Sequence, residues 1–277
     1  MLAFTITLLL GGLFNPVGAE VQQGAKVARI GYLGGHSADS YVREAFLQGL
    51  RELGYVEGRN VVFEFRFPEG KLARYPALAA ELVALKVDVI VAAGTPAALA
   101  AKQATRTLPI VFASAPDPVE SGLVTSLARP GGNVTETSNL TPELAGKWVE
   151  LLKHAVPRVR QVAVLWQPGA LGKRTEEDMR KQMEVAGRAL EVQLRFFETQ
   201  GPADFDGAFL EMTRARVSAL IVLPGPMFFG ERGRLVDLAA RKRLPTVYPW
   251  KDFVDAGGFM AYGPNISDLF ARRRLRG

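Results

Sequence analysis

The sequence predicts an α/β fold made of two similar lobes, each a parallel sheet between layers of helices. Two observations support this prediction. Short apolar runs typical of strands alternate with amphipathic segments of helical period along most of the chain, which is the pattern of β–α–β units. The second half of the chain then repeats the pattern of the first half, so each half is expected to form one three-layer α/β/α lobe.

The first half alternates regularly between the two kinds of segment. Val42–Leu53 carries apolar residues at helical spacing, and Gly54 follows where a glycine commonly ends a helix. Right-handed crossovers are expected between the parallel strands. The expected strands are Val27–Leu33, Val61–Phe65, Val87–Ala92 and Pro109–Ala113, and the expected helices are Val42–Leu53, Pro76–Lys86 and a segment that opens after Gly94.

The second half continues in the same way. One helix is expected to start at Thr141-Pro142-Glu143, and another to be capped by Thr175, with Met179 and Met183 on its inner face. The remaining elements are the strands Gln161–Trp166, Val192–Phe197, Ser218–Leu223 and Pro245–Tyr248 and the helices near Phe205–Arg216 and Gly230–Arg243.

The spacing of equivalent segments supports an internal repeat. From Ile30 to Ile90 is 60 residues, and from Val162 to Ile221 is 59 residues, each pair lying in matching apolar runs. Both halves also place a Leu-Pro pair before a later strand. Ligands of open parallel sheets bind beyond the carboxyl ends of the strands, so two such lobes are expected to share a cleft and to close on a ligand by a hinge motion.

Composition excludes several classes of protein. Apolar residues make up 48% and charged residues 22%, which are ordinary values for a soluble globular protein. The absence of cysteine excludes disulfides, thiolate metal sites and a lipid-anchoring N-terminal cysteine. Only two histidines occur, so a His-rich metal site is excluded as well. We therefore expect no metal and no cofactor.

The charge of the chain is concentrated at one end. Of the net charge of +6, four positive charges come from Arg272, Arg273, Arg274 and Arg276, and the rest of the chain is nearly balanced. A balanced body without a helix-turn-helix pattern does not indicate a nucleic-acid-binding protein.

The N-terminus has features of an export signal. Leu2–Phe14 is an apolar run, and Val17-Gly18-Ala19 offers the small residues of a cleavage site. A signal peptide over residues 1–19, cleaved after Ala19, is expected. The alternative interpretation is a buried first helix or strand.

Gly94-Thr95-Pro96 is the most informative local motif. With Thr95 as N-cap and Pro96 as the first helical residue, a helix would begin directly after a buried strand. Free backbone N–H groups, the positive end of the helix dipole and a hydroxyl would then suit the carboxylate or phosphate of a small ligand. The alternative is an ordinary capped helix without a ligand.

Other candidate ligand contacts lie after neighbouring strands. Ser114 and Asp117 follow the strand Pro109–Ala113, and Asp117 suits either a ligand ammonium group or a turn before Pro118. Gly34 and Ser37 lie in the loop after the first strand, which either lines the cleft or is simply solvated.

Aromatic residues near strand ends complete the candidate site. Trp166, Tyr248 and Tyr262 are of a type that stacks on the face of a ligand ring, although such residues also form cores. The chain has no G-x-G-x-x-G, Walker A, G-x-S-x-G or H-E-x-x-H motif. We therefore expect no catalysis. The competing interpretation is a cytoplasmic α/β enzyme that uses the same cleft.

Several segments together resemble the ABC transporter substrate-binding proteins of the tryptophan/tyrosine-uptake type, which have the type I periplasmic-binding-protein-like fold. The resemblance covers most of the chain from Ile30 to Asn265. The segments that carry it are Ala45–Gly58, Ala93–Ala97, Pro116–Val119, Leu127–Thr135 and Gly257–Asn265.

The resemblance implies a periplasmic receptor, without catalysis, that hands a small solute, often an amino acid, to ABC permease subunits. Such a receptor touches the membrane only through the permease. Carried over by position, Thr95 and Asp117 would contact the ligand from the first lobe, and Trp166 and Tyr262 from the second lobe and the hinge. Two departures are Gln167, where the family usually has Asn, and Gly225, where it usually has Asp.

The resemblance also divides the chain. Residues 27–137 would form lobe 1, residues 138–257 lobe 2, and residues 258–277 a return crossover and the start of a lobe 1 helix. The family pattern continues beyond this point, so the C-terminus is expected to be truncated.

Overall fold

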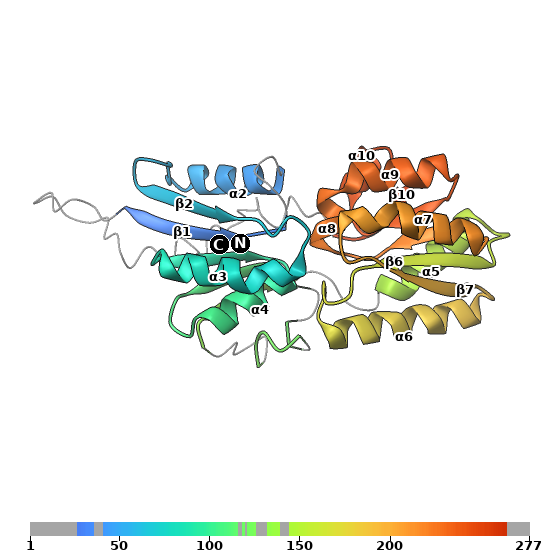
Figure 1. Ribbon diagram of the computed structural model, residues 1–277, viewed down its shortest axis with the longest axis horizontal. Coiled ribbons are helices and arrows are strands. Elements are labelled where there is room, and N and C mark those ends of the chain that lie inside the picture. The colour runs from blue at the N-terminus through green and yellow to red at the C-terminus, as the bar shows by residue number, and fades with distance from the viewer. Residues whose placement is uncertain are drawn as a thin grey trace, which may run out of the picture. The chain divides into compact units, whose positions relative to one another are not determined.

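The computed structural model describes residues 27–35, 41–115, 118–119, 121–125, 132–138 and 144–264. The chain divides into two compact units. The first contains the described residues up to Pro68 and those of Ala73–Ser138, and the second contains Glu69–Leu72 and the described residues of Asn139–Asn265. Figure 1 shows the elements of both units.

The first unit is a five-stranded sheet with the strand order β2-β1-β3-β4-β5. All of its strand pairs are parallel. In Figure 1, α2 covers one face of this sheet, and α3 and α4 cover the other. Its elements are β1 (Ala28–Leu33), α2 (Tyr41–Glu52), β2 (Val61–Arg66), α3 (Tyr75–Ala84), β3 (Val89–Ala93), α4 (Thr95–Ala104), β4 (Ile110–Ala115) and β5 (Val134–Ser138).

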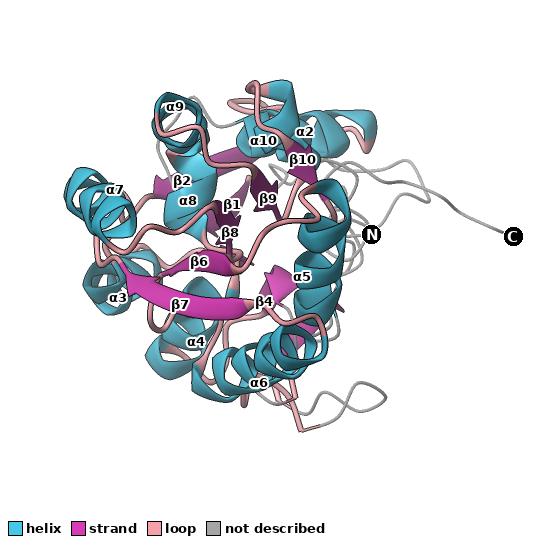
Figure 2. Cartoon of the chain, turned by 90° about the vertical axis from the view of Figure 1, so that its right-hand side faces the viewer, coloured by secondary structure: helices cyan, strands magenta, loops and turns pink. Residues whose placement is uncertain are grey.

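The second unit is also a five-stranded parallel sheet, with the order β10-β9-β8-β6-β7. The helices α7 and α9 lie on one face, and α5 and α6 lie side by side on the other (Figures 1 and 2). Its elements are α5 (Leu144–Ala155), β6 (Gln161–Trp166), α6 (Lys173–Ala189), β7 (Gln193–Glu198), α7 (Phe205–Arg214), β8 (Ala219–Val222), α8 (Pro226–Gly230), α9 (Arg232–Arg241), β9 (Thr246–Tyr248), α10 (Lys251–Asp255) and β10 (Met260–Ala261). Two short 3-10 helices, Leu72–Arg74 and Pro202–Asp204, precede α3 and α7.

The two sheets have the same topology, which confirms the predicted pair of α/β lobes. Written from the opposite edge, the second order is β7-β6-β8-β9-β10, in which each strand matches its counterpart in β2-β1-β3-β4-β5. The turn after β3 therefore corresponds to the turn after β8, and the edge strand β5 corresponds to β10.

Each sheet is buried by apolar side chains from the helices. In the first unit, the ring of Tyr32 on β1 lies 5.5 Å from that of Phe46 on α2 and 5.6 Å from that of Phe65 on β2. In the second, Trp148, Met179 and Met183 belong to one fully buried cluster between the sheet and the α5–α6 layer. Burial of this apolar surface is the main source of stability of each unit.

One predicted helix start is wrong. Thr175 was expected to cap its helix, but α6 begins at Lys173 and its N-cap is Gly172. Gly172 has a φ of 88°. Since glycine adopts this conformation readily, the chain enters the helix before Thr175, which becomes a buried residue of the first turn.

Two parts of the predicted organisation fall partly or wholly outside the described residues. Residues 1–26, which include the expected signal peptide, lie outside them. Of the expected return crossover, β10 pairs with β9 in the second sheet, and residues 265–277 lie outside the described part. Among the described residues, no helix combines the length and apolar character that crossing a membrane requires.

Candidate functional site

The turn between β3 and α4 is formed by Gly94, which has a φ of 91° and a ψ of 162°. Glycine is the residue that adopts this region at little cost. The turn makes Gly94 the N-cap and Thr95 the first helical residue, so the prediction of Thr95 as N-cap and Pro96 as the first helical position is wrong by one residue. The carbonyl of Gly94 accepts the first helical hydrogen bond, from the N–H of Ala98, over 3.1 Å.

The hydroxyl of Thr95 is buried without a partner. Thr95 is 1% exposed, and its Oγ1 makes no hydrogen bond within the part of the chain that the structure describes. A buried polar group without a partner typically costs about 1–3 kcal/mol. The first N–H groups of any α-helix also lack partners inside the helix. The start of α4 therefore combines the unsatisfied hydroxyl of Thr95 with the positive end of the helix dipole.

The neighbouring strands place two further predicted residues at the same edge of the first sheet. Gly34 follows β1, is buried, and donates its N–H to the carbonyl of Arg66 over 3.1 Å. A Cβ on Gly34 would lie 2.3 Å from the ring of Tyr32, so only glycine lets this ring approach. Ser114 belongs to β4, whose Ala113 pairs with Ala93 of β3.

Three of the predicted side chains in the first half are not described. The structure shows the backbone of Ser114 but not its side chain, and Ser37 and Asp117 lie outside the described residues. Their roles stay predictions.

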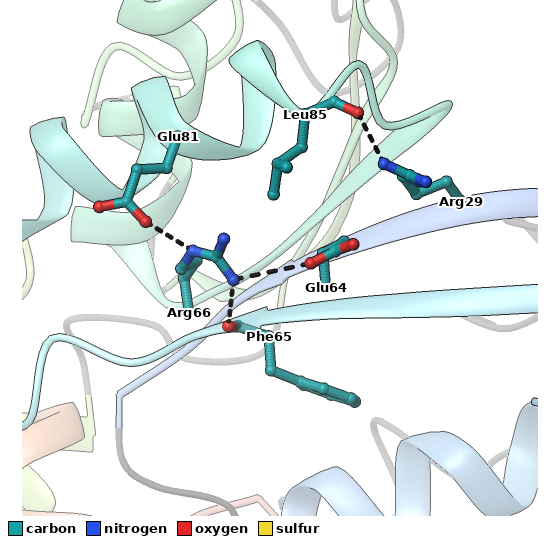
Figure 3. Close-up of polar contacts among 6 residues, drawn as sticks. All are labelled: Arg29, Glu64, Phe65, Arg66, Glu81 and Leu85. Atoms are coloured by element: carbon teal, nitrogen blue, oxygen red, sulfur yellow. Dashed lines mark hydrogen bonds and ion pairs between the residues drawn. The ribbon is translucent and has the colours of Figure 1, made fainter.

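The carboxyl end of β2 carries Arg66, whose charge is balanced by neighbouring carboxylates. Its Nε donates to Glu81 over 2.7 Å, and one of its terminal nitrogens lies 3.8 Å from a carboxylate oxygen of Glu64 (Figure 3). The same nitrogen also donates to the carbonyl of Phe65. Arg66 therefore adds no uncompensated positive charge to this edge, and the start of α4 is the better feature for an anionic ligand group.

At the carboxyl edge of the second sheet, Trp166 and Gln167 follow one another at the end of β6. Each carries a buried polar atom that has no partner among the described residues. Trp166 is the last residue of β6 and packs against the core cluster of α5 and α6. Among the described residues, its buried Nε1 has no hydrogen-bond partner, and neither does the buried Oε1 of Gln167. Gln167 is 2% exposed, and its Nε2 donates to the carbonyls of Gly70, over 3.0 Å, and Gln200, over 3.2 Å.

The loop from β6 to α6 is held by Glu176. Its carboxylate accepts hydrogen bonds from the backbone N–H groups of Gly169, over 3.1 Å, and Leu171, over 3.0 Å. Burial raises the pKa of this carboxyl above its usual range, and the two backbone hydrogen bonds act in the opposite direction. These bonds tie the loop that follows Gln167 to the first turn of α6 at two points.

The end of β9 and the segment that follows it are aromatic. Tyr248, the last residue of β9, is fully buried and stacks on Phe253 with a centroid distance of 4.6 Å. Burial raises the pKa of its hydroxyl to about 12. Trp250 follows, with its ring 5.5 Å from that of Phe229. The buried Nε1 of Trp250 has no partner among the described residues.

Tyr262 lies just after β10 and is 42% exposed. Its backbone, rather than its ring, is tied into the fold. The carbonyl of Tyr262 accepts a hydrogen bond from Trp148 Nε1 over 2.7 Å, and its N–H donates to Tyr248 over 3.0 Å. Its ring is thus available at the surface of the second unit.

The sequence does not single out Gln167 as a candidate ligand contact, and it indicates Trp250 only as one of several aromatic residues near strand ends. Both are large residues next to strand ends, and nothing in the local pattern separates a satisfied amide or indole from an unsatisfied one. The useful signal would have been position, since the carboxyl ends of parallel strands are the usual ligand edge. No group of three or more potential metal ligands occurs among the described residues.

The chain matches known proteins over most of its length. The profile of a family described as "ABC transporter substrate binding protein" matches residues 26–270. A tyrosine-binding protein from Clostridioides difficile is 32% identical over 143 residues, which are 52% of this chain but only 41% of that protein.

Two solved structures agree with the fold. A conserved domain protein from Vibrio cholerae is 25% identical, with a TM-score of 0.78, and the match covers 89% of this chain and 82% of that one. An ABC domain from Streptococcus pneumoniae in complex with L-Trp is 26% identical, with a TM-score of 0.75, covering 88% and 81% of the two chains.

Members of this family are solute-binding proteins rather than enzymes, which confirms the expectation of a protein without catalysis. The repeated parallel sheets are consistent with the profile match, and so are the polar groups at the carboxyl edges of these sheets. The chain belongs to the ABC transporter substrate-binding protein family.

Proposed function

We propose that the chain is an extracytoplasmic receptor that binds an amino acid or a related small aromatic acid and delivers it to ABC permease subunits. The observation that carries the proposal is the buried, unpartnered hydroxyl of Thr95 at the start of α4. A carboxylate there would accept hydrogen bonds from the hydroxyl and the free N–H groups of the helix and would interact favourably with its dipole.

The relatives support this ligand class. One is a tyrosine-binding protein, and one is a structure in complex with L-Trp. The aromatic side chains at the carboxyl edge of the second sheet, Trp166 and Trp250, are suited to stack on a ring of that kind. The family also places such receptors outside the cytoplasmic membrane, and we keep cleavage after Ala19 as part of the proposal.

Substitution of Thr95 tests the proposal. In Thr95→Val the shape is kept and the hydroxyl is lost, so the affinity for L-tryptophan or L-tyrosine should fall about tenfold to a hundredfold, as expected for a lost hydrogen bond to a charged group. Isothermal titration with the purified chain measures it. The fold should not suffer, because a buried unpaired hydroxyl is replaced by a methyl group.

Thr105, at the opposite end of the same helix, is the matched control. Its Oγ1 accepts hydrogen bonds from the backbone N–H groups of Thr107 and Leu108. Thr105→Val should therefore lower the free energy of unfolding by about 1 kcal/mol and leave ligand affinity unchanged. Equal affinities of Thr95→Val and the unaltered chain would show that Thr95 does not contact the ligand.

A further inference from the structure

Gln167 is held in one orientation by its own hydrogen bonds. Both partners of its Nε2, Gly70 and Gln200, are backbone carbonyls, which only accept. The amide nitrogen must therefore face them, and the amide oxygen must point away from them. This assignment follows from the partners and not from the shape of the side chain, which is the same for both orientations.

The oxygen so placed lacks a donor. Oε1 of Gln167 is buried and forms no hydrogen bond with any described residue. An unsatisfied buried acceptor is unfavourable in the free protein, and a ligand that brings a donor removes that penalty. The loop around it does not need to rearrange, because the carboxylate of Glu176 holds the N–H groups of Gly169 and Leu171.

The surroundings indicate which kind of donor fits. Trp166 and Trp250 lie at the same carboxyl edge of the second sheet, and the buried indole N–H of each has no partner in the described part of the chain. The carboxylate of Glu176, in the first turn of α6, is engaged with two backbone N–H groups of the β6–α6 loop. The described part of this edge is therefore aromatic and offers uncharged polar groups, which suits a polar ring rather than a charged end of a ligand.

We propose that Gln167 determines specificity by accepting, at Oε1, a hydrogen bond from a ring hydroxyl or ring N–H of an aromatic ligand. The proposal rests on the function proposed above and assigns the recognition of the ring substituent to the second unit. A ring without such a donor would leave the oxygen unsatisfied and would bind more weakly.

Pairs of probes that differ only in the donor test the proposal. Isothermal titration compares L-tyrosine with L-phenylalanine, and L-tryptophan with 1-methyl-L-tryptophan. The unaltered chain should prefer the donor-bearing member of at least one pair by about tenfold, and Gln167→Met should reduce that ratio to about one. Gln167→Met also removes the hydrogen bonds to Gly70 and Gln200, but this loss would weaken the binding of both probes in a pair alike. The ratio of their affinities therefore reports the effect of the oxygen alone.

Gln161 provides the matched control. It lies at the amino end of the same strand, β6, and its Oε1 is also buried without a partner. Gln161→Met should keep the ratio of the unaltered chain, because the amino end of the strand is the edge opposite to the proposed ligand contact.

The outcomes separate the two proposals. The role of Gln167 is overturned if the probes bind and Gln167→Met leaves the affinity ratio of a probe pair unchanged. It is also overturned if Gln161→Met abolishes that ratio equally. Both results leave the receptor function standing. Absence of binding by the unaltered, folded chain to all four probes overturns the proposed ligand class, and the role of Gln167 with it.

Discussion

The turn after β3 and the turn after β8 occupy the same place in the two repeats but are built from different side chains. In the first unit, Gly94 has a positive φ, and the helix that follows begins with the unpartnered hydroxyl of Thr95. In the second, Gly225 is extended with a φ of −176°, and α8 places Met227 and Phe228 in the core, both fully buried.

The difference shows that repetition of a fold does not repeat its site. In the first unit the turn leaves polar groups unsatisfied at the carboxyl edge of the sheet. In the second unit the equivalent turn is filled by apolar packing, and the buried polar atoms without a partner among the described residues include those of Trp166, Gln167 and Trp250. Recognition must therefore be argued from the side chains of each unit and cannot be carried across by topology.

The largest effect is expected from Phe228, if its turn serves packing. Phe228 is fully buried, with its ring 6.0 Å from that of Phe205. Phe228→Ala should lower the free energy of unfolding by about 3–5 kcal/mol, because it leaves a cavity. Urea denaturation measures the loss, with Leu210→Ala, at a side chain 47% exposed, as the control. A loss no larger than that of the control would argue against a packing role for this turn.

The two glycines should differ in a second, smaller effect. Gly94→Ala should lower the free energy of unfolding by about 1–3 kcal/mol, since its φ of 91° and ψ of 162° form a region that side chains other than glycine avoid. Gly225→Ala should lower the free energy of unfolding by a smaller amount. Its backbone is one that any residue adopts, and the added Cβ, 3.2 Å from Phe228 Cδ2, needs only a small shift of that ring. If thermal or urea unfolding shows that both variants lose the same free energy of unfolding, the two turns do not differ in the conformation that they require.

The smallest effect concerns the loop that carries the polar residues of the second unit. The pKa of Glu176 is raised by burial above the ordinary value of 4.5, so the native chain holds this proton to higher pH than the unfolded chain does. Its contribution to stability is then fully present below about pH 4.5 and is lost as the pH rises through the native pKa.

A comparison with Glu176→Gln isolates this contribution. The free energy of unfolding of the unaltered chain, minus that of the variant, should decrease from pH 4 to pH 7. Denaturation at several pH values measures the difference. A difference that is constant or increases with pH would show that the two backbone hydrogen bonds outweigh burial.

Most strands are predicted well from the sequence, including the edge strands β2 and β7, but the last strand of each sheet is not. The strand Gln161–Trp166 is predicted with the bounds of β6, because a strand with a neighbour on each side is a continuous apolar run. The strands β5 and β10 are not predicted, and both are edge strands at equivalent places in the two sheets. Val134–Ser138 has four polar residues in a row after Val134, and Met260–Ala261 is too short for any pattern, so pairing with β4 and β9 makes them strands.

The candidate site divides in a similar way. The local pattern of Gly94, Thr95 and Pro96 is sufficient to predict a helix start after a buried strand, because capping and the conformations of glycine and proline act within a few residues. The family resemblance also rests on local segments. The exact N-cap depends on the φ of Gly94, which the sequence leaves open between neighbouring residues.

What the residue types and their periodicity determine here is the order of strands and helices and the repeat. Which polar atoms remain unsatisfied depends on contacts between distant segments. The amide of Gln167 turns its oxygen away from the carbonyl of Gly70 because its nitrogen donates to that carbonyl, 97 residues away in the chain. Hydrogen-bond satisfaction is a property of the packed interior, and only the folded chain brings those partners together.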